Sequence, residues 1–177
     1  TLKWNGESFR EKEERDWKRK GAVMKITVLG AGSWGTALSI TLWKNKHTVY
    51  LWTHDENEAK YLKEKRKCTN LPEVVIPEEI RILTSLEEAV KEGEVLVYAV
   101  PSIFTRSMGE RTLPYVRKEQ VLVTVSKGIE ESTLFTMTDI LEEFFPENKI
   151  AVLSGPSHAE EVSRFIPTTI VCASKDE

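Results

Sequence analysis

The stretch that decides the fold is Lys25-Ile26-Thr27-Val28-Leu29-Gly30-Ala31-Gly32-Ser33-Trp34-Gly35. A short apolar run, typical of a buried β-strand, meets three glycines at the spacing G-x-G-x-x-G, and a helix-like stretch follows. Gly30 allows a tight strand-to-helix turn, Gly32 lets the backbone approach a ligand, and Gly35 lets the helix pack on the strand. Because amides at the start of such a helix point at phosphate groups, the stretch predicts a pyrophosphate-binding loop.

Three glycines at this spacing also occur in turns that bind nothing, so the flanking sequence has to decide between the two interpretations. Residues 36–43 place apolar side chains on one helical face, and residues 48–52 form a second apolar, β-prone run. Strand, glycine turn, helix and strand together make a βαβ unit. This context favours a ligand-binding loop.

The rest of the chain keeps the same alternation of short apolar runs and helix-like stretches. It predicts strands at residues 25–29, 48–52, 81–83, 94–100, 120–125, 149–153 and 168–173. Helices are predicted at residues 34–46, 56–66, 86–91, 102–113, 132–145 and 158–164, and residues 69–79, with two prolines, are predicted to form a loop. This order is typical of a doubly wound α/β fold around a mostly parallel, Rossmann-like sheet.

The apolar residues of one predicted helix also indicate part of the hydrophobic core. In residues 132–145, apolar side chains recur at helical spacing and are expected to be core contacts. They are Leu134, Phe135, Met137, Ile140, Leu141, Phe144 and Phe145.

Length and composition indicate one domain. The 177 residues are 40% hydrophobic and 30% charged, with a net charge of −3, which suits a domain with a sizeable core. Residues 1–23 precede Met24 and are dense in both charges, so we expect a charged leader outside the native domain, which then takes residues 24–177.

Composition also limits the kinds of binding partner that we expect. Lysine and arginine are interleaved with acidic residues, so we do not expect nucleic acid as a partner, and no apolar run approaches the length of a membrane span. Cys68 and Cys172 are far apart and lack metal-ligand spacing, so no metal site is predicted. Both are expected to be reduced thiols of a cytoplasmic protein.

Polar segments follow five of the predicted strands directly, at residues 30–35, 53–55, 101–102, 126–128 and 154–157. Ligands of open α/β sheets bind in the crevice beyond the carboxyl ends of the strands. We therefore expect these five segments to gather along one edge of the sheet.

The segment after the second strand bears on the choice of cofactor. NAD sites usually carry an acidic residue there, which accepts the ribose 2′-hydroxyl. This chain has Thr53 and His54, which permits NADP and gives His54 a predicted contact with the cofactor. Asp55 comes one place later and either caps the next helix or serves the ribose, so NAD stays open.

Two later segments suggest a substrate site. Lys127 is either a solvated lysine at a strand end or an ammonium group that holds an anionic or carbonyl-bearing substrate beside the nicotinamide. We favour the second interpretation because of its place in the crevice. Ser157 and Glu160 fit a capping box at the start of the next helix, and the amides of that turn would face the same crevice.

With these segments assembled, the chain from Met24 onward resembles the amino-terminal domain of bacterial NAD(P)-dependent glycerol-3-phosphate dehydrogenases. The residues that carry the resemblance are Gly30-Ala31-Gly32-Ser33-Trp34-Gly35-Thr36-Ala37, Leu51-Trp52-Thr53-His54-Asp55, Ala99-Val100-Pro101-Ser102, Val125-Ser126-Lys127-Gly128-Ile129-Glu130 and Leu153-Ser154-Gly155-Pro156-Ser157-His158-Ala159-Glu160-Glu161-Val162.

The resemblance implies hydride transfer between nicotinamide C4 of NAD(P)H and C2 of dihydroxyacetone phosphate, which gives sn-glycerol 3-phosphate for glycerophospholipid synthesis in the cytoplasm. It implies two sets of contacts: Ser33, Trp34, His54, Lys127 and Ala159 with the dinucleotide, and Lys127, Gly155 and Ser157 with the three-carbon phosphate. A homodimer is compatible with it for the full-length enzyme. Many members have arginine where this chain has His54, so the resemblance leaves any preference for NADP open.

In the family, the general acid/base lysine lies in a helical carboxyl-terminal domain, so we expect it beyond Glu177 and predict no catalytic residue within this chain. These 177 residues are then expected to bind cofactor and to turn over little or no substrate. Two alternatives stay open: a dinucleotide-sensing module without catalysis, and a dehydrogenase of the β-hydroxyacid or 6-phosphogluconate type. Lys127 and residues 154–157 disfavour the sensor, and the run Gly155-Pro156-Ser157-His158-Ala159-Glu160 disfavours the other dehydrogenases.

Overall fold

Seven short apolar runs pair into one sheet, as the sequence predicts. The computed structural model describes residues 23–175, so all of the expected leader except Val23 lies outside the described residues. The strands are β1 (Lys25–Leu29), β2 (Thr48–Trp52), β5 (Arg81–Leu83), β6 (Val95–Tyr98), β7 (Val121–Thr124), β8 (Ile150–Ser154) and β9 (Val171–Ser174). They lie in the order β5-β2-β1-β6-β7-β8-β9.

The strand order places a switch point at the centre of the sheet. The neighbours from β5 to β8 pair in parallel, and only β9 runs antiparallel, to β8. The chain leaves β1 toward β2 and β5 on one side and returns to β6 on the other. Open α/β sheets bind ligands at this kind of reversal, beyond the carboxyl ends of the strands.

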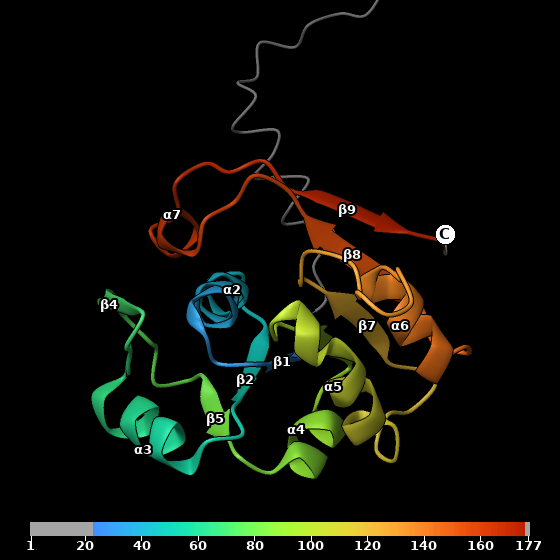
Figure 1. Ribbon diagram of the computed structural model, residues 1–177. Helices are drawn as coiled ribbons and strands as arrows, with labels where there is room; N and C mark the ends of the chain where they lie inside the picture. Colours follow the sequence, from blue (N-terminus) through green and yellow to red (C-terminus); the bar gives the residue numbers. More distant parts are fainter. Residues whose placement is uncertain (1–22, 176–177) are drawn as a thin grey trace, which may run out of the picture.

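Helices cover both faces of this sheet (Figure 1). α2 (Ser33–Lys44), α3 (Glu56–Lys65) and α7 (Ala159–Ser163) lie on one face. α4 (Leu86–Glu92), α5 (Thr105–Thr112) and α6 (Met137–Phe144) lie on the other, and η1 (Ser102–Phe104) leads into α5. The doubly wound, mostly parallel fold predicted from the sequence is therefore confirmed.

Strand β1 shows how one run of residues serves two cores. Ile26 and Val28 are buried in the cluster under α2 and α3, whereas Leu29 is buried in the cluster under α4, α5 and α6. This alternation follows from the two-residue period of a strand. Thr27 is also fully buried, and its hydroxyl donates to the Ala89 carbonyl at 2.7 Å.

The prediction of a loop at residues 69–79 is wrong. This segment contains one arm of a hairpin, because β3 (Lys67–Cys68) pairs antiparallel with β4 (Leu71–Val75). Cys68 and Leu71 are each 3% exposed, so buried apolar contacts hold the pair together. Pro72 is tolerated because a strand at a sheet edge can do without one ladder N–H.

The helix expected at residues 132–145 starts later, at Met137. Thr136 caps it in a capping box with Asp139, and Leu134 takes a left-handed backbone angle, φ +60°. As a result Leu134 is 70% and Phe135 40% exposed, so their predicted place in the core is wrong. The expected core positions Met137, Ile140, Leu141 and Phe145 are buried, and Phe144 is partly buried.

In the part of the chain that the structure describes, no helix is both long and apolar enough to cross a membrane. Cys68 and Cys172 are both free thiols, the first buried and the second exposed.

Candidate functional site

The three glycines of the loop between β1 and α2 meet different surroundings. A Cβ on Gly30, whose φ is +123°, would lie 2.6 Å from the Ala99 carbonyl oxygen. A Cβ on Gly35 would lie 1.9 Å from the Gly30 oxygen, whereas a Cβ on Gly32 would meet nothing within 4 Å. The first and third glycines are thus required by packing, and the second faces open space, where a phosphate group can approach the backbone.

The start of α2 is suited to an anion. Gly32 is its N-cap, no side chain hydrogen-bonds to its first amides, and its first turn holds no acidic residue. The free amides and the positive end of the helix dipole therefore meet whatever ligand approaches Gly32. Beside them, the buried indole Nε1 of Trp34 has no hydrogen-bond partner among the described residues.

Two adjoining hollows extend from this loop along the edge of the sheet. The first hollow, about 460 Å³, is lined by Gly30, Ala31, Gly32, Trp52, Thr53, His54, Glu58, Ala99, Val100, Pro101, Phe104, Ser107, Met108 and Arg111. The second hollow, about 510 Å³, is lined by Ser33, Trp34, Val100, Pro101, Ser102, Val125, Ser126, Lys127, Ser157, His158, Ala159 and Glu160. Val100 and Pro101 border both hollows.

The structure brings the predicted site residues together around these hollows. Gly30, Gly32 and His54 line the first hollow, and Ser33, Trp34, Lys127, Ser157 and Ala159 line the second. Gly35 is buried beneath the loop, and Gly155 lies within hydrogen-bond reach of Lys127. The gathering of polar segments that was expected at the carboxyl ends of the strands is therefore present.

Lys127 sits at the end of β7 with an exposed side chain. Its Nζ donates to the Gly155 carbonyl oxygen at 2.9 Å, which links the segments that follow β7 and β8. Gly155 has a φ of +141°, and a Cβ there would lie 2.8 Å from the Thr169 carbonyl oxygen. Glycine thus lets the backbone turn beneath the ammonium group.

The capping box predicted at Ser157 and Glu160 is wrong. The N-cap of α7 is His158, and no side chain caps this helix. Ser157 takes part in the preceding turn instead, because its N–H donates to the Gly155 carbonyl at 2.9 Å. The Ser157 hydroxyl also donates to the Gly155 carbonyl, at 3.5 Å, so Ser157 lines the second hollow without capping a helix.

Local sequence patterns did not predict an ion-pair network around Arg106, which holds Glu130, three residues after Lys127. The guanidinium of Arg106 in α5 makes two bonds to the Glu130 carboxylate, at 2.7 and 2.8 Å, and two to Glu143 at 3.1 Å. The Thr133 hydroxyl also donates to Glu130, at 2.6 Å. The hydrogen bonds from Arg106, and next the one from Thr133, lower the pKa of Glu130 to about 2. Residues 24 positions apart are joined here, which no local pattern indicates.

The sequence also gave no indication that the carboxylate of Glu58 lines the first hollow. Thr53 is 2% exposed, and its hydroxyl donates to the carboxylate of Glu58 in the first turn of α3. Asp55 caps the same helix by accepting from the amides of Asn57 at 2.7 Å and Glu58 at 3.1 Å. Of the two roles considered for Asp55, the helix cap is confirmed.

A family model for the amino-terminal part of NAD-dependent glycerol-3-phosphate dehydrogenase matches residues 25–177. The chain belongs to this family. The resemblance inferred from the five segments is therefore confirmed, and it covers nearly all of the described residues.

Relatives of known name agree with this assignment. The chain is 46% identical over 156 residues to a glycerol-3-phosphate dehydrogenase [NAD(P)+] of Agathobacter rectalis, covering 88% of this chain and 46% of that protein. It is likewise 46% identical over 158 residues to the protein of that name from Fusobacterium nucleatum, covering 88% and 47%. The chain thus spans about half the length of the curated relatives it matches.

Solved structures share the fold. A glycerol-3-phosphate dehydrogenase from Coxiella burnetii superposes with a TM-score of 0.82 at 26% identity, covering 87% of this chain and 47% of that one. The Plasmodium falciparum glycerol-3-phosphate dehydrogenase, at 20% identity and a TM-score of 0.78, shows the likeness of fold alone and covers 93% and 49%.

Proposed function

We propose that this domain is the cofactor-binding part of an NAD(P)-dependent glycerol-3-phosphate dehydrogenase. In this proposal the pyrophosphate of the dinucleotide lies against Gly32 and the start of α2, the adenosine half enters the first hollow, and the nicotinamide half enters the second. The open space at Gly32 and the uncapped amides of α2 support this fit. Ser33, Trp34, His54 and Ala159 are the further side chains proposed to contact the dinucleotide.

The substrate is proposed to bind in the second hollow, against Lys127 and the turn at Gly155 and Ser157. The Lys127 ammonium would bind the phosphate-bearing substrate and orient its C2 carbonyl, while the Ser157 hydroxyl would bind a substrate oxygen. The dinucleotide, when bound, supplies hydride chemistry at nicotinamide C4. The lysine that exchanges the proton at the C2 oxygen is proposed to lie in the carboxyl-terminal half of the full-length enzyme.

One observation carries the proposal: Lys127, from the end of β7, and Ser33 and Trp34, from the start of α2, line the same hollow. A substrate held by Lys127 would therefore lie beside a nicotinamide whose pyrophosphate rests on the glycine loop. A sensor without catalysis has no need for a cation at this place.

Turnover of the full-length enzyme tests the proposal. We expect NADH or NADPH to be oxidised with dihydroxyacetone phosphate, and Lys127→Ala to reduce kcat/KM by roughly a hundredfold or more, because it removes a charge-assisted contact to the substrate. Lys118→Ala is the matched control. Lys118 is an exposed lysine before β7 that pairs with Glu147 at 3.6 Å, so its loss should leave kcat/KM unchanged.

Other outcomes would contradict the proposal in distinct ways. Binding of dinucleotide without oxidation would favour the sensing module. Oxidation with 6-phosphogluconate or β-hydroxyacids, and not with dihydroxyacetone phosphate, would favour the other dehydrogenases. Equal kcat/KM values for Lys127→Ala and Lys118→Ala would contradict a contact between Lys127 and the substrate.

The setting of the full-length enzyme is also a proposal. We place it in the cytoplasm, where it would feed glycerophospholipid synthesis, and the two free cysteines support a reducing compartment. A homodimer of the full-length enzyme stays a prediction, which sedimentation of that protein can test.

A further inference from the structure

The first hollow contains a carboxylate whose position there no local sequence pattern predicts. Glu58 belongs to α3, yet it lines this hollow together with Thr53 and His54, the residues that follow β2. The hydroxyl of Thr53, itself buried at the end of β2, donates to the Glu58 carboxylate. The negative charge of Glu58 is therefore held at the carboxyl end of the second strand.

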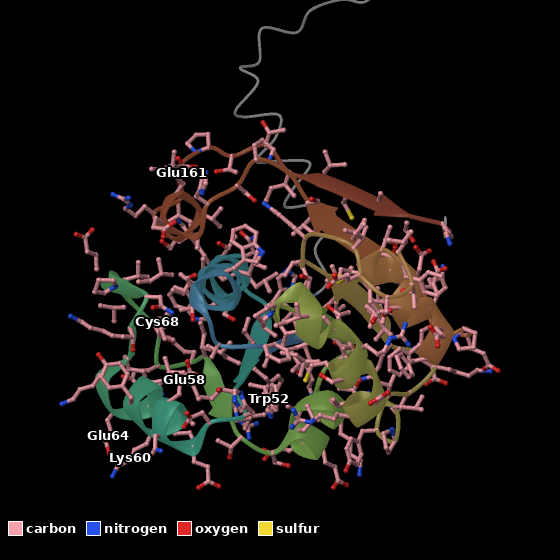
Figure 2. The ribbon with its side chains drawn as sticks, in the orientation of Figure 1. Trp52, Glu58, Lys60, Glu64, Cys68 and Glu161 are labelled. Atoms are coloured by element: carbon pink, nitrogen blue, oxygen red, sulfur yellow. The ribbon has the colours of Figure 1, made fainter. Side chains whose placement is uncertain are left out.

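Two further contacts hold this carboxylate in place. The Thr53 hydroxyl oxygen accepts the Asp55 N–H at 3.3 Å, so its proton is free to point at Glu58. Asp55 accepts the Glu58 N–H at 3.1 Å and so ties the first turn of α3 to the same corner. Figure 2 shows Glu58 on the side of α3 toward the sheet, whereas Lys60 and Glu64, which pair with each other at 4.0 Å, project outward.

A carboxylate at this place discriminates between two dinucleotides. In NAD sites an acidic residue at the end of the second strand accepts the ribose 2′-hydroxyl, and the same charge repels a 2′-phosphate. The chain has threonine at that position and supplies the acid from the following helix instead. We propose that Glu58 is a specificity-determining residue that makes this domain prefer NAD(H) to NADP(H).

The first hollow is also lined by a cation, Arg111, which comes from a different element. Arg111 comes from α5, on the opposite face of the sheet from α3, and its guanidinium carbon lies 5.5 Å from the centre of the Trp52 ring. Its guanidinium therefore packs over the Trp52 indole. Glu58, and not Arg111, is hydrogen-bonded to the residue that follows β2.

This inference rests on the proposed function, because it assumes that the first hollow receives the adenosine half. The test is calorimetric titration of the chain with NADH and with NADPH at one ionic strength. We expect NADH to bind at least about tenfold more tightly. Glu58→Gln, which keeps the shape of the side chain and removes its charge, should tighten NADPH binding about tenfold and change NADH binding by no more than about threefold.

Glu56→Gln is the matched control. Glu56 is an exposed acid in the same first turn of α3 that does not line the first hollow, so its loss changes the net charge equally and should leave the ratio of the two affinities unchanged. Tight NADH binding with a ratio that Glu58→Gln does not change, or NADPH preferred by the unmodified chain, would overturn the role of Glu58 alone. Binding of neither dinucleotide would instead overturn the proposed function, and this inference with it.

Discussion

At the scale of single residues, the glycine loop could be predicted from the sequence because its chemistry is local. Gly30, Gly32 and Gly35 lie within six consecutive residues, and their spacing alone indicates a turn, a close approach and a packing contact. Glu58 could not be predicted in the same way. Its place in the first hollow depends on how α3 sits against the end of β2, and that is a property of tertiary structure.

The loop gives a prediction with an internal control. Gly32→Ala should leave the free energy of unfolding within about 1 kcal/mol, since its φ is −63° and its Cβ would meet open space, yet it should weaken NADH binding severalfold or more. Gly35→Ala should destabilise the chain by about 1–3 kcal/mol or more, because its Cβ would overlap the Gly30 oxygen. Chemical denaturation and calorimetry measure both. Equal effects of the two variants on stability would contradict this division.

At the scale of elements, the strands could be predicted because short runs rich in apolar and β-branched residues form them, as in β1, β2 and β7. In β1 and in β2, four of the five residues are buried, which covers both faces of the strand. The hairpin of β3 and β4 could not be predicted, because Pro72 disfavours a strand. The late start of α6 could not be predicted either, because the apolar residues before Met137 continue a helical spacing. Contacts of the folded chain determine both elements: the buried Cys68 and Leu71 in the hairpin, and the Thr136 capping box at the start of α6.

The Arg106 network gives a prediction about pH at this scale. The pKa of Glu130 falls from 4.5 to about 2 in the fold, so its ion pair stabilises the native state above pH 4.5, and this contribution is lost as pH falls from about 4.5 to about 2. Glu130→Gln should therefore unfold at a lower temperature than the unmodified chain at pH 7, and the difference should shrink toward pH 2. Melting curves at several pH values measure it.

A matched variant controls for the loss of a surface charge. Glu147 pairs with Lys118 at 3.6 Å, both side chains being about 70% exposed, so Glu147→Gln should change the melting temperature little at any pH. A difference between Glu130→Gln and the unmodified chain that stays constant from pH 7 to pH 2 would contradict the assigned ion pair.

At the scale of the whole molecule, the proposed function requires the two hollows to be halves of one site. They meet at Val100 and Pro101, just beyond β6, next to the switch point between β1 and β6. The parallel pairing of the strands places both hollows at the carboxyl edge of the sheet, and this much follows from the alternation of strands and helices in the sequence. The linking of Lys127 to Gly155 required the structure.

The most direct test of this central claim is a titration of the ¹⁵N-labelled chain with NADH, followed by amide chemical shifts. We expect the largest shifts at Gly32, Ser33 and Lys127 together, with little change at the opposite edge, for example at Lys118. Shifts confined to the amino ends of the strands, or shifts at Gly32 with none at Lys127, would contradict a dinucleotide that lies across both hollows.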